Sequence, residues 1–263
     1  MRTPFSRIFD VSETPAYDRI GRGYARHRRG DPRIAARIED ALGDARSVLN
    51  VGAGSGSYEP PAREVTAVEP SAEMIAQRPE SAAPVIQASA ESLPFEADSF
   101  DAALAVLTAH HWHDLGAGLE EMQRVARSRI VIVTFEPEAL RDLWIATDYF
   151  PRILELQRPS GAGSRNLVEM LPAARSSPLP VPHDCEDLFF AALWARPELF
   201  FDEDVVRPMW VWQSISEEER RSGRERLEAD LESGAWEQRH GHLRETEELD
   251  VGLRLVVCEL GAR

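Results

Sequence analysis

The sequence of this 263-residue chain predicts an α/β fold, in which helices cover a mainly parallel sheet. Two observations support this fold. Short apolar runs alternate with helix-like segments over residues 31–137. The first two runs, residues 48–51 and 65–68, are separated by a glycine cluster at residues 52–56, and the second run ends at Glu69. This layout is typical of the first βαβ unit of a nucleotide-binding sheet.

Each part of this unit has a physical role. Glycine lets the backbone turn sharply and approach a ligand closely, and a carboxylate at the tip of the second strand can accept two hydrogen bonds from a ribose diol. The dinucleotide fingerprint G-x-G-x-x-G would place its third glycine at position 57, where Ser57 stands. The third glycine is Gly56 instead, which disfavours an NAD-dependent oxidoreductase without removing it as an alternative.

Composition limits the classes of function. The length suits one α/β domain with a sizeable core. A net charge of −15 argues against general affinity for nucleic acid or anionic membranes. Cys185 and Cys258 are too far apart in sequence to indicate a disulfide framework or a zinc site. No apolar run reaches membrane-spanning length and the start does not read as a signal peptide, so we expect a cytoplasmic monomer or homodimer.

The first helix and the strands can be placed in order. Asp31 and Pro32 read as a helix cap and a first helical residue, apolar side chains recur every fourth position from Ile34 to Leu42, and Gly43 reads as a stop. Further strands of the sheet are expected at three apolar runs, residues 84–87, 102–106 and 129–134.

The second half of the chain loses the strand–helix rhythm. We expect helices at residues 138–157 and 167–174, a proline-broken edge strand at 178–183, a charged helix that begins with a capping box at Ser216 and a last strand at 253–260.

The order of these motifs resembles the class I S-adenosylmethionine (SAM) dependent methyltransferases of the methyltransferase domain 11 type. The resemblance rests on G-x-G-x-G, the following acid Glu69, and Ala90-Glu91 before Leu-Pro-Phe, and it continues as far as Glu136. It implies a Rossmann-like sheet of seven strands in the order 3-2-1-4-5-7-6, the last antiparallel, with a helical substrate cap. The implied parts are an N-terminal helical lid (1–30), a SAM-binding core (31–137), cap and substrate-binding insertions around the sixth strand (138–248), and the last core strand (249–263).

The resemblance also implies the cofactor, SAM, with S-adenosyl-L-homocysteine (SAH) as the product. The residues expected to bind SAM are Arg28, Gly52, Ala53, Gly54, Gly56, Tyr58, Glu69, Pro70, Met74, Ser89, Ala90, Glu91 and Leu107. Met74 would pack on the adenine or belong to the core, and Arg28 would pair with the methionine carboxylate or lie in solvent. Asn50 and Ser89 stand where most relatives carry acids, which keeps open a catalytically silent SAM-binding protein with a regulatory or assembly role.

A histidine cluster follows the fourth strand, where ligands bind in open α/β sheets. His111 is the candidate catalytic residue, as a base or by positioning the substrate, and Tyr24 of the leader is the second, closing over the methyl group or packing on the core. The histidines could equally hold their loop by hydrogen bonds. They lack the i, i+4 register of a helical metal site, so no metal is predicted.

The acceptor is expected to be a small molecule, an aromatic intermediate of secondary metabolism methylated on oxygen, nitrogen or an electron-rich carbon such as an indole carbon. Aromatic side chains in the cap suit a flat apolar substrate, although they could also form the cap's own core. The residues expected to line the substrate pocket are His110, Trp144, Tyr149 and Phe150.

Overall fold

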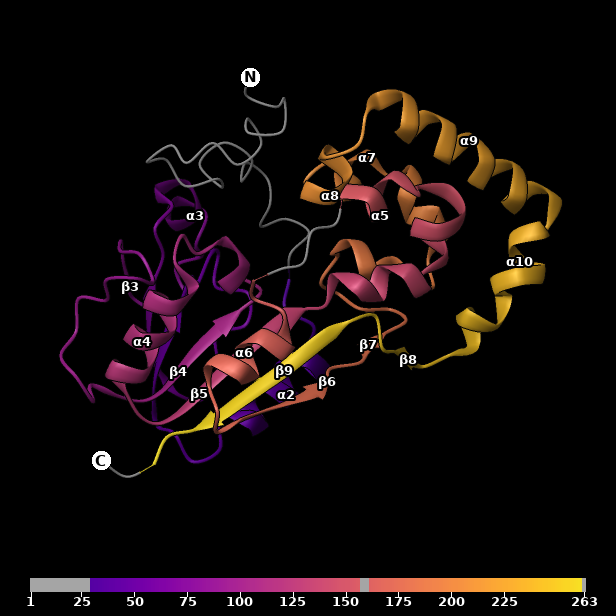
Figure 1. The fold of residues 1–263 in the computed structure, drawn as a ribbon. Helices are drawn as coiled ribbons and strands as arrows, with labels where there is room; N and C mark the ends of the chain where they lie inside the picture. Colours follow the sequence, from indigo (N-terminus) through magenta and orange to yellow (C-terminus); the bar gives the residue numbers. More distant parts are fainter. Residues whose placement is uncertain (1–28, 157–160, 262–263) are drawn as a thin grey trace, which may run out of the picture.

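The computed structural model describes residues 29–156 and 161–261, and Figure 1 shows the fold. A seven-stranded sheet runs in the order β3-β2-β1-β4-β5-β9-β6. The five strands from β3 to β5 are parallel, and β9 is antiparallel to both of its neighbours. Because β6 and β9 are the sixth and seventh strands of this sheet, the predicted order 3-2-1-4-5-7-6 is confirmed. The strands are β1 Ser47–Val51, β2 Glu64–Val68, β3 Val85–Ile86, β4 Phe100–Val106, β5 Ala126–Phe135, β6 Ala174–Pro178 and β9 Leu253–Glu259.

Helices cover both faces of the sheet. The helices of the first half are α2 Pro32–Ala41, α3 Ala72–Ala76 and α4 Leu115–Val125. Successive side chains of β4 alternate between the faces: Leu104 belongs to the same buried cluster as Ile38 of α2, whereas Ala105 belongs to the cluster that contains Leu119 of α4. The side chain of Asp31 accepts a hydrogen bond from Arg33 N, so the predicted cap of α2 is confirmed.

The sixth strand was predicted at the wrong residues. The sheet strand is β6, Ala174–Pro178, whereas Val181–Pro182 forms β7, which pairs with β8, Glu248–Leu249, in a separate two-stranded sheet. Four of the five residues of β6 are exposed, so no apolar run marks the strand in the sequence. The prediction of an edge position is correct, because β6 ends the sheet.

The second half builds a helical cap at one end of the sheet (Figure 1). The expected helix over residues 138–157 is three short pieces, a 3₁₀ helix Pro137–Asp142, a π-helix Ile145–Tyr149 and α5 Arg152–Leu156. The other helices are α6 Ser164–Met170, which packs on the sheet, and α7 Glu203–Val206, α8 Trp210–Gln213, α9 Glu217–Ser233 and α10 Ala235–His240 in the cap. The capping box of Ser216 and Glu219 at the start of α9 is confirmed.

The cap and one face of the sheet share a single buried cluster, in which Trp144 of the cap joins Val133 of β5. Helix α9 closes on this cluster at Gly223. A Cβ there would lie 2.2 Å from Phe150 Cε1 and 2.7 Å from the main-chain oxygen of Tyr149.

We expect Gly223→Ala to lower the free energy of unfolding by about 1–3 kcal/mol, because the added methyl overpacks this contact. Alanine would otherwise stabilise a helix interior by about 1 kcal/mol relative to glycine, so a loss identifies the clash. Urea unfolding measures the change, and Glu228→Ala at an exposed position of α9 is the control. Equal stability of the Gly223 variant and the parent chain would contradict the close packing.

Candidate active site at the carboxyl edge of the sheet

The parallel strands β1, β2, β4 and β5 all end at one edge of the sheet. The chain order reverses between β1 and β4, since β2 and β3 lie on one side of β1 while β5 lies beyond β4. Open α/β sheets bind their ligands at such a switch point. The glycine loop (residues 52–56), Glu69 and the histidine turn (residues 107–113) therefore meet at this edge, as the sequence predicts.

The glycine loop takes a conformation that favours glycine. Gly52, Gly54 and Gly56 have φ of +69°, +53° and +89°. The backbone N–H of Gly52 donates to Val68 O at 2.8 Å, which ties the loop to the end of β2. A Cβ at Gly52 would lie 2.1 Å from Thr108 Oγ1, so this position brings the ends of β1 and β4 into direct contact. Nothing in the sequence marked Thr108 as a residue of this site.

Glu69 is buried, with 5% of its surface exposed, and its carboxylate is fixed in direction by the backbone. It accepts hydrogen bonds from Gly54 N at 2.8 Å and Ser71 N at 2.9 Å. Ser71 also caps α3 by accepting from Met74 N, and the Met74 side chain reaches to within 3.4 Å of the Cβ position of Gly54. The acid thus couples the glycine loop to the first turn of the next helix.

The histidine turn begins with a residue in a rare backbone conformation. Leu107, at the end of β4, has φ +51°, which a branched side chain seldom adopts. Such strain is found most often at functional sites. The 3₁₀ helix Ala109–His111 follows, and the rings of His110 and His111 are 3.9 Å apart between centroids and exposed to solvent.

The expected adenine-binding residues lie beside this turn. Ala90 is 4% exposed and Ser89 is exposed. The carboxylate of Glu91 accepts from His113 N at 2.6 Å and from Asp114 N at 3.2 Å. Glu91 therefore orders the histidine turn. Ala53 and Pro70 are half-buried neighbours of the loop and of Glu69.

Several residues predicted to bind SAM or the substrate are buried by other parts of the chain. The Tyr58 hydroxyl donates to Asp187 Oδ2 at 3.0 Å, beneath the cap. Trp144, Tyr149 and Phe150 are 4%, 2% and 2% exposed and pack against one another and other cap aromatics, with the Trp144 and Tyr149 rings 5.7 Å apart. The structure thus places the three aromatic rings in the core of the cap, the alternative that the sequence left open, rather than at an open wall.

The leader residues Tyr24 and Arg28 lie outside the described residues. The start of the described chain lies close to the end of the glycine loop. A Cβ at Gly30 would lie 2.1 Å from the main-chain oxygen of Ser57, the residue that follows the loop.

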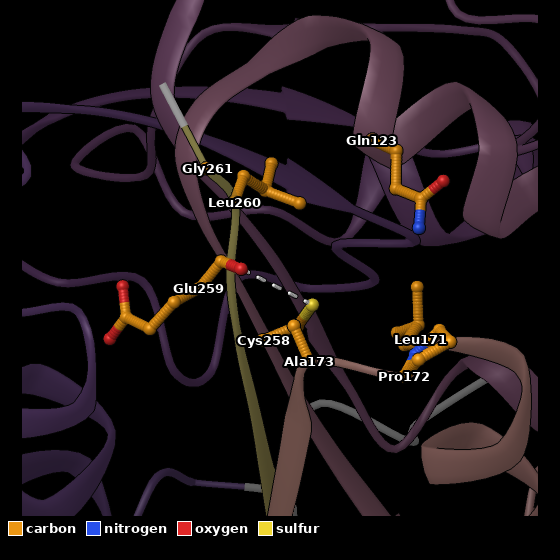
Figure 2. Close-up of a pocket in the computed structure, with 8 residues that line it drawn as sticks. All are labelled: Gln123, Leu171, Pro172, Ala173, Cys258, Glu259, Leu260 and Gly261. Atoms are coloured by element: carbon orange, nitrogen blue, oxygen red, sulfur yellow. Dashed lines mark hydrogen bonds between the residues drawn. The ribbon is translucent and has the colours of Figure 1, made fainter. Parts of the chain in front are cut away.

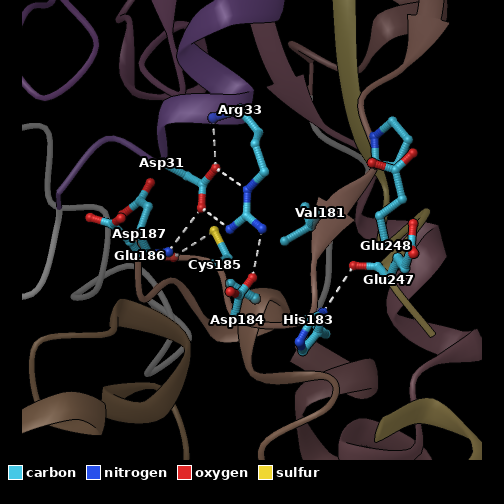
Figure 3. A network of polar contacts seen from close by, with 12 residues as sticks. Asp31, Arg33, Val181, His183, Asp184, Cys185, Glu186, Asp187, Glu247 and Glu248 are labelled. Carbon is cyan, nitrogen blue, oxygen red and sulfur yellow. Dashed lines mark hydrogen bonds and ion pairs between the residues drawn. The ribbon is translucent and has the colours of Figure 1, made fainter. Parts of the chain in front are cut away.

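A polar network around the buried side chain of Asp31 joins the core to the base of the cap (Figure 3). Asp31 is fully buried; its carboxylate accepts from Arg33 Nη2 at 2.8 Å and from Glu186 N at 3.1 Å, and Arg33 also pairs with Asp184 at 2.7 Å. Burial alone would raise the pKa of Asp31, but the hydrogen bonds from Arg33 and Glu186 outweigh it and lower the pKa to about 2. Asp31 is therefore ionised. It links helix α2 to the segment around Glu186 at the base of the helical cap.

The hollow in Figure 2 is separate from this site. It has a volume of about 270 Å³ and is lined by residues that include Gln123 of α4, Leu171 after α6 and Cys258 of β9. Because β9 is antiparallel to β5, its carboxyl end lies at the opposite edge of the sheet. Over the described ranges no group of three His, Cys, Asp or Glu side chains could hold a metal ion, and no helix is long and apolar enough to span a membrane.

Known proteins share this arrangement. The model of the methyltransferase domain family matches residues 49–133. A protein of Anabaena variabilis ATCC 29413, described as a methyltransferase from an antibiotic biosynthesis pathway, is 30% identical, with 89% of this chain and 99% of that chain covered and a TM-score of 0.79.

More distant relatives show the fold alone or match a short segment. The cyclase SpnF has 14% identity, 96% and 98% coverage of this chain and its own, and a TM-score of 0.55. A protein of Anaeromyxobacter dehalogenans, described as a type II methyltransferase, has 20% identity, 88% and 96% coverage and a TM-score of 0.50. Protein YafE of Escherichia coli (strain K12) is 40% identical over 65 residues, which are 23% of this chain and 31% of that protein. The match spans about a third of YafE.

The sheet order, the glycine loop and the buried acid after β2 define a Rossmann-like methyltransferase. The chain belongs to the class I SAM-dependent methyltransferase family, as its similarity to the Anabaena protein over nearly the full length of both chains shows.

Proposed function

We propose that this chain transfers a methyl group from SAM to a small aromatic molecule, an intermediate of a biosynthetic pathway for natural products. The main support for the proposal is the position of Glu69. Hydrogen bonds from Gly54 N and Ser71 N hold its buried carboxylate at the edge of the sheet where the glycine loop lies. The Anabaena relative, which is described as belonging to an antibiotic pathway, supports the substrate class.

The residues present fit SAM. The backbone of the glycine loop would cradle the methionine part, Glu69 would hold the ribose, and Ala90 with its neighbours would face the adenine. SAM supplies a methyl group that is already activated as a sulfonium, so orientation is the main task of the protein. Met74, buried at 3% exposure beside Gly54, would pack on the adenine.

The histidine turn provides a group that can accept a proton. His111 is exposed at the end of β4, and a histidine titrates in the range that a general base needs at neutral pH. As the methyl group leaves the sulfonium sulfur of SAM, which becomes SAH, and bonds to the acceptor atom, the His111 imidazole would take the proton that this atom loses. Glu91 keeps the turn in place by binding His113 N and Asp114 N.

Replacement of His111 by alanine should lower kcat by about 100-fold and leave the Kd of SAH unchanged, because the proton acceptor is lost while the cofactor contacts remain. The measurement uses radiolabelled SAM with a panel of phenols, indoles and aromatic amines. His113→Ala, two residues further along the same exposed segment, is the matched control. An unchanged kcat for the His111 variant would remove this residue from the mechanism.

Calorimetric titration with SAM, SAH and NAD tests the proposal as a whole. Micromolar binding of SAM and SAH, without binding of NAD, is the expected result. Binding without turnover for every acceptor would favour the silent SAM-binding alternative, for which Asn50 and Ser89 are the sequence evidence. Binding of NAD alone would overturn the methyltransferase.

A further inference from the structure

Asn50 lies at the end of β1, directly before the glycine loop, and is 4% exposed. It brings a neutral amide to a position where the resemblance to the methyltransferases implies an acid. Its Nδ2 atom is 3.5 Å from Oε1 of Glu59, which follows the loop in sequence. A carboxylate therefore reaches this position from another part of the chain.

Glu59 forms a buried ion pair with Arg78, which follows α3. The Arg78 Nη2 and Glu59 Oε1 atoms are 2.5 Å apart, and the two side chains are only 4% and 9% exposed. The second carboxylate oxygen of Glu59 accepts from Ala83 N at 2.9 Å. Two buried charges persist only when they are paired and hydrogen-bonded, and both conditions are met here.

Arg78 uses its remaining donors on the main chain. The Nη1 atom donates to Gly54 O at 3.0 Å. The Nη2 atom, which also pairs with Glu59, donates to Ala83 O at 3.0 Å. The N–H of Gly54 donates to Glu69. Gly54, which has φ +53°, thus has its N–H bound by the Glu69 carboxylate and its carbonyl oxygen bound by the Arg78 guanidinium. Arginine suits this role because its planar fork binds several acceptors at once.

We propose that Arg78 and Glu59 are positioning residues that hold the glycine loop in the shape that receives the methionine part of SAM. In this arrangement Glu59 also places a carboxylate oxygen 3.5 Å from the amide nitrogen of Asn50. The proposal rests on the proposed function, since it presumes that the loop binds SAM.

The chain contains a matched control for this clamp. Arg63 also pairs with one carboxylate, Glu39 at 2.6 Å, and also donates to two main-chain oxygens, those of Ala45 and Glu39. It precedes β2, so it lies at the edge of the sheet opposite the glycine loop. Its loss should affect stability in a similar way without touching the proposed cofactor site.

The test is calorimetric titration of the full chain with SAH and with adenosine, for the parent, Arg78→Gln, Arg78→Lys and Arg63→Gln. Because the clamp acts on the part of the loop that would meet the methionine moiety, Arg78→Gln should weaken SAH binding about tenfold and adenosine binding less than about threefold. Arg78→Lys should recover part of the loss, since it keeps the charge. Arg63→Gln should bind both ligands like the parent.

Equal losses for SAH and adenosine, or an unchanged SAH affinity in Arg78→Gln, would overturn the clamp while the proposed function stands. A parent chain that binds no SAH would overturn both. If Arg78→Gln does not fold because Glu59 is left buried and unpaired, the double variant Glu59→Gln/Arg78→Gln removes both charges and is held to the same criteria.

Discussion

Replacing Glu69 by alanine is expected to reduce the affinity for SAM by about 100-fold, close to 3 kcal/mol. The substitution would remove the two charge-assisted hydrogen bonds that the carboxylate would accept from the ribose. It would also release the N–H groups of Gly54 and Ser71, which it now binds at 2.8 and 2.9 Å. Release of these two N–H groups would disorder the loop in addition to the loss of the ribose contact. The fall in SAM affinity should therefore lie at the upper end of the range expected for one side chain.

Calorimetry with SAH gives the affinity, and Glu69→Gln separates the two causes. Glutamine keeps one oxygen that can accept from Gly54 or Ser71 but carries no charge, so an intermediate affinity is expected. Glu73→Gln, at a half-buried acid in the following helix, is the control for loss of charge near the site. SAH affinity in Glu69→Ala equal to that of the parent would rule out the ribose role.

The sheet could be predicted from sequence because its strands are buried on both faces. The apolar runs around Leu49, Leu104 and Val131 stand out from their surroundings, and the glycine loop and acid mark the first two strands. Caps such as Asp31 and Ser216 were readable because the local chemistry of a helix start depends on few neighbours.

The edge strand β6 could not be predicted in the same way. Four of its five residues face solvent, so only its pairing with β9 defines it, and such pairing is not a local property of the sequence. Nothing in the sequence marks the π-helix Ile145–Tyr149 either; the residue that follows it, Phe150, packs closely on α9 at Gly223.

The site was predictable in its backbone parts and less so in its side chains. The order β-strand, glycine loop, acid is compact in sequence, whereas the ion pair of Arg78 and Glu59 joins two residues 19 apart with no motif. The resemblance implied that Trp144 and Tyr149 belong to the cap, but their aromatic character could not say whether a ring faces a ligand or another ring. Thr108 carries no signal at all, since only the approach of β4 to Gly52 gives it a role.

The second large effect concerns the junction of core and cap. Asp31→Ala should lower the free energy of unfolding by about 3 kcal/mol at pH 7, because it removes the cap of α2 and takes the acceptor away from the Glu186 N–H. The Arg33 side chain is 46% exposed and can return to solvent, so its lost ion pair adds little.

The pH dependence gives the sharper test of this junction. The pKa of Asp31 is lowered from 3.8 to about 2 in the folded chain, so the unfolded chain takes up the proton first as the pH falls. The stabilisation, about 2 kcal/mol, is therefore present above pH 4 and is lost as the pH falls toward 2, with about half gone at pH 3.

Urea unfolding of the parent and Asp31→Asn at pH 7 and pH 3 measures this loss. The asparagine variant keeps an oxygen for the helix cap but has no group to titrate, so its stability disadvantage should shrink by about 1 kcal/mol at pH 3. Asp40→Asn, in the last turn of the same helix and outside the network, is the control for removing a carboxylate from α2. A pH-independent difference for Asp31→Asn would mean that its charge does not hold the cap to the core.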